Sequence, residues 1–216
     1  MFQFLLCALL TLFVTGCDSP RYIDYFPYDD QGIAKSKVAL IPMMDRSGKD
    51  LPCDASEQFT RGIRYEMMDH AKLYLLPQEQ VSQRVASLGK FDFFIKDQTL
   101  SDLFCDVDFI ILMELVEHDL ASGAKDECTK QEYCCYDRVL MKIRVRVLDV
   151  RRRCPVIVLQ EVIPCNYQIP CAKQDMRVGT PCVDHPEYRL SPAGQAHQRM
   201  INSVVERLEC VIQGAR

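Results

Sequence analysis

The chain has 216 residues, which is enough for one ordinary globular domain with a sizeable core and too few for two. Its formal net charge is −4 and its pI is about 5.6, and this lack of a basic excess argues against a nucleic-acid partner. Hydrophobic residues make up 48% of the chain, and the 11 prolines and 9 glycines are ordinary counts, so the composition excludes a disordered protein.

The first sixteen residues differ from all that follow. They contain no charged side chain, and their apolar core runs from Phe4 to Val14. A helix of this length, rising about 1.5 Å per residue, is too short for the roughly 30 Å hydrocarbon core of a bilayer. An apolar segment that ends in small residues is typical of secretory signals, so residues 1–16 are predicted to be a signal peptide.

This segment ends in Val14-Thr15-Gly16-Cys17. An aliphatic residue, two small residues and a cysteine resemble the lipobox of bacterial lipoproteins. The resemblance implies cleavage between Gly16 and Cys17, an S-diacylglycerol on the Cys17 thiol and an N-acyl chain such as palmitate on its amine. Two or more acyl chains hold a protein stably at a bilayer, because each buried methylene contributes about 0.8 kcal/mol to the free energy of membrane binding. The alternatives are an ordinary signal peptide with a chance cysteine at its boundary, and an uncleaved anchor.

Residues 17–37 are predicted to be the lipidated N-terminus and a tether, and residues 38–216 a folded domain. The tether is polar, contains two prolines and shows no sustained periodicity. Its aromatic and acidic stretch at residues 22–30 is typical of a segment that lies on the domain surface, and the alternative is a docking segment.

The first half of the domain is predicted to alternate strands and helices. Val38–Met44 is an apolar run suited to a buried strand, and Asp45–Gly48 turns the chain. Asp54, with Glu57 three residues later, begins a helix. The inward face of this helix carries Phe59, Ile63 and Met67. The elements predicted after it are a strand at Lys72–Leu76, a helix from Pro77 with Val81, Val85 and Leu88 inward, a short helix with Leu100, Leu103 and Phe104, and a central strand at Val107–Val116.

The second half is predicted to be a hairpin, a loop region and a last helix. Residues 139–150 alternate, which is typical of a half-buried strand, with a basic outer face of Lys142, Arg144 and Arg146. A turn leads into a second strand at Val156–Leu159, and residues 166–190 are expected to be loop. The last helix is capped by Ser191, begins at Pro192 and ends at Gly214, with an apolar face of Met200, Ile201, Val204, Val205, Leu208 and Ile212.

This order of elements predicts an α/β fold. We expect a single compact domain in which helices cover a mixed β-sheet, with a Cys-rich loop region in the C-terminal half. Apart from Cys7 in the signal and Cys17, ten cysteines remain, an even number that favours disulfides in an exported protein. The candidate disulfide cysteines are Cys53, Cys105, Cys128, Cys134, Cys135, Cys154, Cys165, Cys171, Cys182 and Cys210.

One motif in the domain has a family resemblance. Lys37 to Gly48, KVALIPMMDRSG, resembles the opening strand of a group of envelope proteins that includes the curli-secretion lipoprotein CsgG, the LpoB-type lipoproteins and the N-terminal domain of TolB. The resemblance implies a compact α/β domain over residues 37–213. The sequence departs from the family in its cysteine density and in Arg151-Arg152-Arg153, where a glycine is usual. Glu117–Asp137 is too charged for the membrane hairpin of a CsgG-like pore.

No motif for catalysis or metal binding was found. The chain lacks the metalloprotease, phosphate-loop and nucleophile-elbow patterns. The most site-like cluster is Cys182, Asp184 and His185, although a loop cysteine in an oxidising compartment is expected to be bridged. His70 and His197 are expected to have structural or surface roles. The cysteine spacings do not match zinc knuckles, so we expect no metal and no cofactor other than the covalent lipid.

Arginines 151–153 extend the basic strand face. They are expected to be a solvated hairpin tip, and the alternative is contact with anionic lipid headgroups.

The sequence thus favours a non-catalytic envelope lipoprotein that binds or helps to assemble another envelope protein. It would be anchored in the bilayer by its lipid and would face the periplasm or the cell exterior, with oligomers possible. The alternatives are a thiol–disulfide oxidoreductase that uses Cys134 and Cys135, and a structural protein crosslinked through its cysteines.

Overall fold

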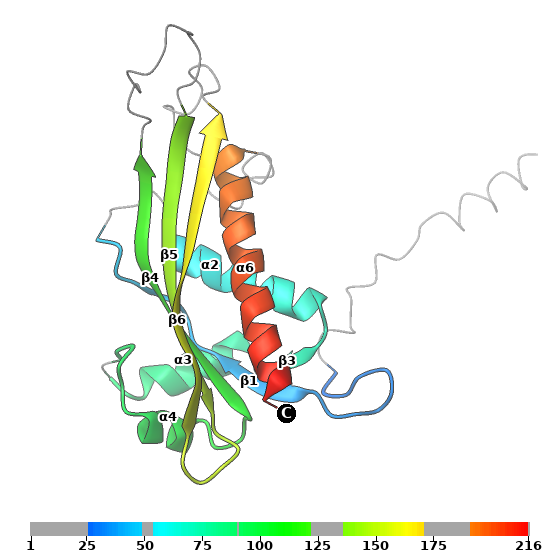
Figure 1. The fold of residues 1–216 in the computed structure, drawn as a ribbon. Coiled ribbons are helices and arrows are strands. Elements are labelled where there is room, and N and C mark those ends of the chain that lie inside the picture. The colour runs from blue at the N-terminus through cyan, green and yellow to red at the C-terminus, as the bar shows by residue number, and fades with distance from the viewer. Residues whose placement is uncertain (1–25, 49–53, 90, 122–135, 171–190, 216) are drawn as a thin grey trace, which may run out of the picture.

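A mixed sheet of six strands with helices on both faces organises the chain in the computed structural model (Figure 1). The structure describes residues 26–48, 54–89, 91–121, 136–170 and 191–215. It confirms the α/β class and the single domain with a mixed sheet, whereas most of the Cys-rich loop region lies outside the described residues. Within them, no helix combines the length and the apolarity needed to cross a membrane.

The strands run in the order β3-β1-β4-β5-β6 across the sheet, and β2 extends the pairing along β4. The parallel part comprises β1 (Ser36–Leu40), β2 (Met44–Asp45), β3 (Leu73–Leu75) and the start of β4 (Phe109–Ala121). The antiparallel part joins β4 to β5 (Tyr136–Asp149) and β5 to β6 (Val156–Pro170). β4 is therefore the central strand, as its apolar sequence predicted.

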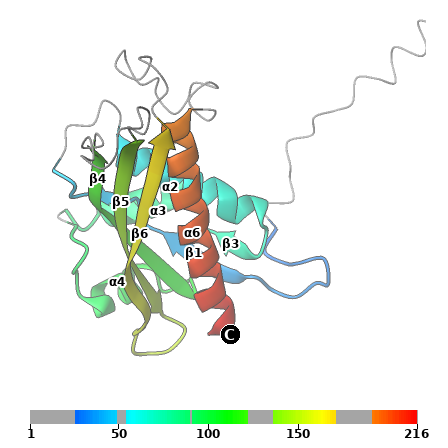
Figure 2. The same ribbon diagram turned by 45° about the horizontal axis from the view of Figure 1, so that its top comes forward.

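One face of the sheet is covered by α2 (Ala55–Asp69) and α6 (Pro192–Gly214). Both views show α6 running alongside β6 and α2 crossing α6 (Figures 1 and 2). Phe59, Ile63 and Met67 of α2 are buried, and so are all six predicted apolar residues of α6. Asp54 caps α2 by accepting a 2.9 Å hydrogen bond from the Glu57 amide, and Ser191 caps α6 through the Gly194 amide.

The other face is covered over only part of its length. There α3 (Gln78–Ala86) and α4 (Asp97–Leu103) pack with Ala39 of β1 and with Ile41, which follows β1. Their core extends no further along the sheet than Leu112 on β4 and Leu148 on β5. The sheet is thus covered by helices on both faces at one end and on one face at the other. This difference leaves an open sheet face beyond Leu112.

Three predicted boundaries were wrong, and hydrogen bonding explains each. The run Val38–Met44 is two strands, because β1 ends at Leu40 and Pro42 has no amide hydrogen to continue the ladder. β4 continues five residues past Val116, where His118 pairs with Met141. A loop was expected from Asn166 onward, but β6 continues to Pro170, because Asn166 pairs with Leu140 of β5. Glu117, Asp119 and Asn166 of these extensions lie on the open side, and such polar positions interrupt the apolar pattern that predicts a strand.

Candidate functional site

The open sheet face is formed by the outward residues of the three antiparallel strands. It comprises Glu114, Glu117 and Asp119 of β4, Lys142 and Arg144 of β5, and Val162, Pro164 and Asn166 of β6. A row across it joins Glu114, Arg144 and Val162, and Val162 is 45% exposed. An acidic strand thus lies beside a basic one, with an apolar and neutral strand at the edge.

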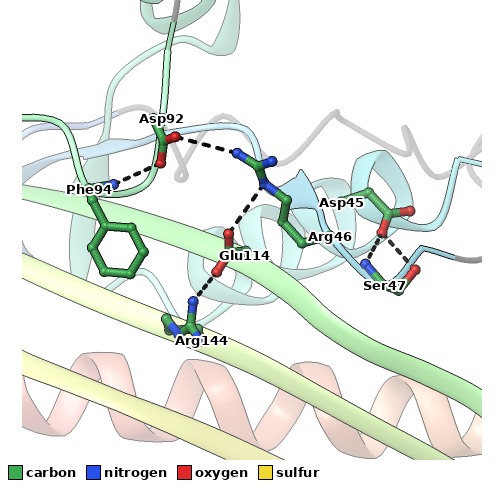
Figure 3. A network of polar contacts seen from close by, with 7 residues as sticks. All are labelled: Asp45, Arg46, Ser47, Asp92, Phe94, Glu114 and Arg144. Carbon is green, nitrogen blue, oxygen red and sulfur yellow. Dashed lines mark hydrogen bonds and ion pairs between the residues drawn. The ribbon is translucent and has the colours of Figure 1, made fainter.

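Glu114 is the centre of the polar contacts at this face. Its side chain is only 6% exposed and accepts a 2.5 Å hydrogen bond from Nη1 of Arg144. Its other carboxylate oxygen lies 3.5 Å from Nε of Arg46 (Figure 3). Because a carboxylate in an apolar strand must be compensated, the two guanidinium groups fix its position and it fixes theirs.

The motif Asp45-Arg46-Ser47-Gly48 places Arg46 at this point. The Asp45 carboxylate accepts hydrogen bonds of 2.8 and 2.7 Å from the Ser47 amide and hydroxyl, and Gly48 has a φ of 68°, so the chain turns as predicted. The Arg46 amide bonds the Leu115 carbonyl at 2.9 Å, which anchors β2 on β4. The Arg46 side chain then reaches both Glu114 and Asp92.

Asp92 belongs to the loop between α3 and α4, and this loop presents an exposed aromatic ring. Asp92 lies 3.5 Å from Nη2 of Arg46, and it accepts a 3.1 Å hydrogen bond from the Phe94 amide. Phe94 is 66% exposed, whereas its neighbour Phe93 is fully buried. The Arg144 guanidinium lies 5.8 and 5.7 Å from the centres of the Phe93 and Phe94 rings, within the range of a cation–π contact.

Arg146 holds the same loop from beneath. It is buried, donates a 3.1 Å hydrogen bond to the Phe93 carbonyl and forms an ion pair with Asp97. The loop that carries Phe94 is therefore fastened by Arg46, Arg144 and Arg146. Sequence analysis had not singled out Phe94 or Glu114, although a carboxylate within the most apolar strand and opposite a basic strand was the available signal.

The alternating basic face of β5 is confirmed, but its charges are compensated. Lys142 pairs with Glu117 at 2.6 Å, beside the pairs of Arg144 and Arg146. Arg151 donates hydrogen bonds of 2.6 Å to the Asp149 carboxylate and to the Ala215 carbonyl, so it is not part of a solvated hairpin tip. Its hydrogen bonds hold the pKa of Asp149 below its usual value. Arg152 and Arg153 are exposed, as expected.

Two histidines that are far apart in sequence meet between β4 and α6. Nε2 of His118 lies 2.8 Å from Nε2 of His197, whose ring centre is 5.0 Å from that of Phe59. Burial lowers the pKa of His118 and, with the neighbouring ring, lowers the pKa of His197 to about 3. Both imidazoles are therefore neutral near pH 7. His70, at the end of α2, instead bonds Glu209 at 3.0 Å.

The cysteines divide between described and undescribed parts of the chain. Cys105, Cys154, Cys165 and Cys210 have free thiols, so the structure does not bear out the disulfide prediction at these positions. Burial raises the pKa of the Cys165 thiol, which makes it less nucleophilic. The lipid site Cys17, the cluster of Cys182, Asp184 and His185, and the remaining candidate disulfide cysteines lie outside the described residues. These remaining candidates are Cys53, Cys128, Cys134, Cys135 and Cys171. In the part of the chain that is described, no three potential metal ligands cluster.

A family model described as "Family of unknown function (DUF7499)" matches residues 24–216. No curated protein matches the chain. The hypothetical protein CT253 from Chlamydia trachomatis has a similar structure, with a TM-score of 0.63 and 21% identity over 82% of this chain and 96% of that one. This likeness shows a shared fold.

Two further structures are more distant. Lipoprotein GNA1162 from Neisseria meningitidis has a TM-score of 0.46 and 10% identity, over 80% of this chain and 97% of that one. The LpoB C-terminal domain from Salmonella enterica has a TM-score of 0.37 and 11% identity, over 60% of this chain and 81% of that one. We draw no functional conclusion from these two structures.

Proposed function

Since the chain belongs to the DUF7499 family of unknown function, we propose from its own residues that it is a membrane-anchored envelope lipoprotein that binds or positions another envelope protein and catalyses no reaction. Lipidation at Cys17 would hold the domain at the membrane surface, as the lipobox Val14–Cys17 implies. The domain would face the periplasm or the cell exterior, with the covalent lipid as its only attached group.

The observation that carries this proposal is the exposed Phe94 beside the Glu114 network on the open sheet face. Aromatic and arginine side chains are enriched in protein interfaces, and those held rigidly contribute most to binding. Phe94 and Val162 provide apolar area, while Arg46 and Asp92 provide charges of both signs around it. We infer a protein partner that offers an apolar side chain to Phe94 and complementary charges to this rim.

A photocrosslinking amino acid placed at position 94 of the full chain, expressed in cells, tests the proposal. Position 65 is a matched control, because Tyr65 on α2 is 63% exposed and α2 packs on the opposite face of the sheet. We expect one discrete crosslinked protein from position 94 and none from position 65. Identical crosslinking at the two positions, or none at position 94, would contradict a binding role for this face.

Fatty-acid labelling of the same cells tests the anchor. The unsubstituted chain should incorporate label and lose the mass of residues 1–16, whereas Cys17→Ala should remain unlabelled. An unlabelled natural chain would refute the lipoprotein half of the proposal and leave the crosslinking result to stand by itself.

A further inference from the structure

A pocket of about 470 Å³ lies away from the open sheet face, where the described chain begins. Its walls come from the segment after Phe26, from β1 and β3, and from the start of α3. The lining residues that the inference uses are Tyr28, Lys35, Lys37, Tyr74, Pro77 and Gln80. Among the described residues that line the pocket, none is acidic, so its two charged side chains are both cationic.

Lys35 is the unusual residue of this pocket. It is only 9% exposed, and its backbone amide bonds the Pro27 carbonyl at 2.8 Å. No carboxylate within the described ranges pairs with its ammonium group. The stem of Lys35 is buried, while its ammonium group keeps contact with solvent at the pocket, so this charge is available to a bound anion. The position therefore suits an anion from outside the chain.

Lys37 behaves differently and serves as an internal comparison. Its ammonium group donates a 2.9 Å hydrogen bond to Asp106, which is also paired with Arg84. The Arg84 guanidinium, and then Lys37, hold the pKa of Asp106 well below its usual range. The charge of Lys37 is thus compensated within the protein, whereas that of Lys35 is not.

The start of α3 adds a second source of positive potential. Pro77 precedes the helix and no side chain caps its first turn. The uncapped amides of a helix N-terminus carry a partial positive charge and favour phosphate and other anions. Glu79 lies in this turn but is exposed and is not among the residues that line the pocket.

We propose that this pocket binds a phosphate group, with the Lys35 ammonium as its counter-charge. The start of α3 contributes its dipole, and the hydroxyls of Tyr28 and Tyr74 and the amide of Gln80 are the neutral donors available. The phosphate is that of a lipid headgroup or of a free soluble ion. Pro27 follows Cys17 by ten residues, a span of at most about 36 Å. The lipid source alone rests on the proposed anchoring at Cys17, because it requires the pocket to be within reach of the bilayer.

Lysine labelling with an acylating reagent, read by mass spectrometry, tests the site directly. The full chain is labelled in zwitterionic micelles with inorganic phosphate, and with sodium chloride at equal ionic strength as the control. We expect phosphate to slow the labelling of Lys35 several-fold and to leave exposed Lys96 unchanged. The variant Lys35→Met, which keeps the apolar stem, should weaken phosphate binding at least tenfold by calorimetry, whereas Lys96→Met should bind as the natural chain does.

A lipid arm separates the two sources. The full chain is reconstituted in phosphatidylglycerol and in phosphatidylcholine bilayers and labelled without added phosphate. Protection of Lys35 in phosphatidylglycerol supports a headgroup ligand, and protection by inorganic phosphate alone supports a soluble one. Equal labelling of Lys35 under all conditions, or unchanged binding by Lys35→Met, would overturn the proposal. The micelle arm needs neither lipidation nor a protein partner, so its failure is distinct from failure of the proposed function.

Discussion

At the scale of single residues, Glu114 shows how one buried charge organises a surface. Its carboxylate lies in a strand between two fully buried neighbours. Two arginines converge on it, one from β5 and one from the turn after β2. One of these, Arg144, also contacts the ring of exposed Phe94. The position of the proposed binding residue therefore depends on a carboxylate that is almost inaccessible to solvent.

We expect Glu114→Gln to lower the free energy of unfolding by about 1–3 kcal/mol, because it leaves Arg144 and Arg46 without their shared counter-charge. Glu117→Gln on the same face of β4 is the control. Its ion pair with Lys142 is much more exposed, so we expect a loss of about 0–1 kcal/mol. Urea unfolding of both variants measures the difference. Equal losses of unfolding free energy would show that burial of Glu114 adds nothing to the stabilisation that its ion pairs provide.

At the scale of elements, the two helices on the covered face approach closely at Gly62. A glycine within a helix costs about 1 kcal/mol relative to alanine, so its presence in α2 requires a reason. A side-chain carbon at position 62 would lie 2.5 Å from Cδ1 of Ile201 in α6. The glycine makes room for the partner helix, and packing outweighs helix propensity here.

Gly62→Leu should therefore destabilise the protein by about 1–3 kcal/mol through overpacking. Ile201→Ala creates space at the same contact, so the double variant should be more stable than the sum of the single effects predicts. A double-mutant cycle measures this coupling, which we expect to be about 0.5–3 kcal/mol. Strictly additive effects would show that the two helices do not meet at this point.

At the scale of the whole molecule, the pair of His118 and His197 joins the central strand to the last helix. An unfolded chain takes up protons at these rings near pH 6.5, whereas burial lowers the pKa of both in the folded protein, to about 3 for His197. Because the unfolded state binds more protons in this window, acid favours unfolding.

The free energy of unfolding should fall as the pH is lowered from about 6.5 toward 3, by up to about 1.4 kcal/mol per pH unit for each additional proton bound by the unfolded chain. Urea unfolding between pH 7 and pH 4.5 measures this slope. His197→Gln should reduce it, and His70→Gln, which removes a histidine outside the pair, should leave the contribution of the pair in place. A slope unchanged by His197→Gln would contradict the assignment to this pair.

Much of the fold follows from patterns that extend over only a few residues. The helical face of Phe59, Ile63 and Met67, the alternation of β5, and the caps Asp54 and Ser191 were predictable, because each depends on neighbours within a turn or a strand. The boundaries of β4 and β6 were not, since their ends are set by hydrogen bonds to a paired strand and their polar faces resemble loops.

The candidate sites were less accessible from the sequence. Arg46 could be identified through its turn motif, but its partners Glu114 and Asp92 are 68 and 46 positions away, respectively. Likewise, the two histidines are separated by 79 positions, and nothing near either of them indicates the other. Local chemistry thus determined the class of fold and most of its elements, and it is the basis on which an export signal is predicted. Only the tertiary structure decided which charges meet and which remain uncompensated, because these depend on contacts between distant segments whose register no short pattern records.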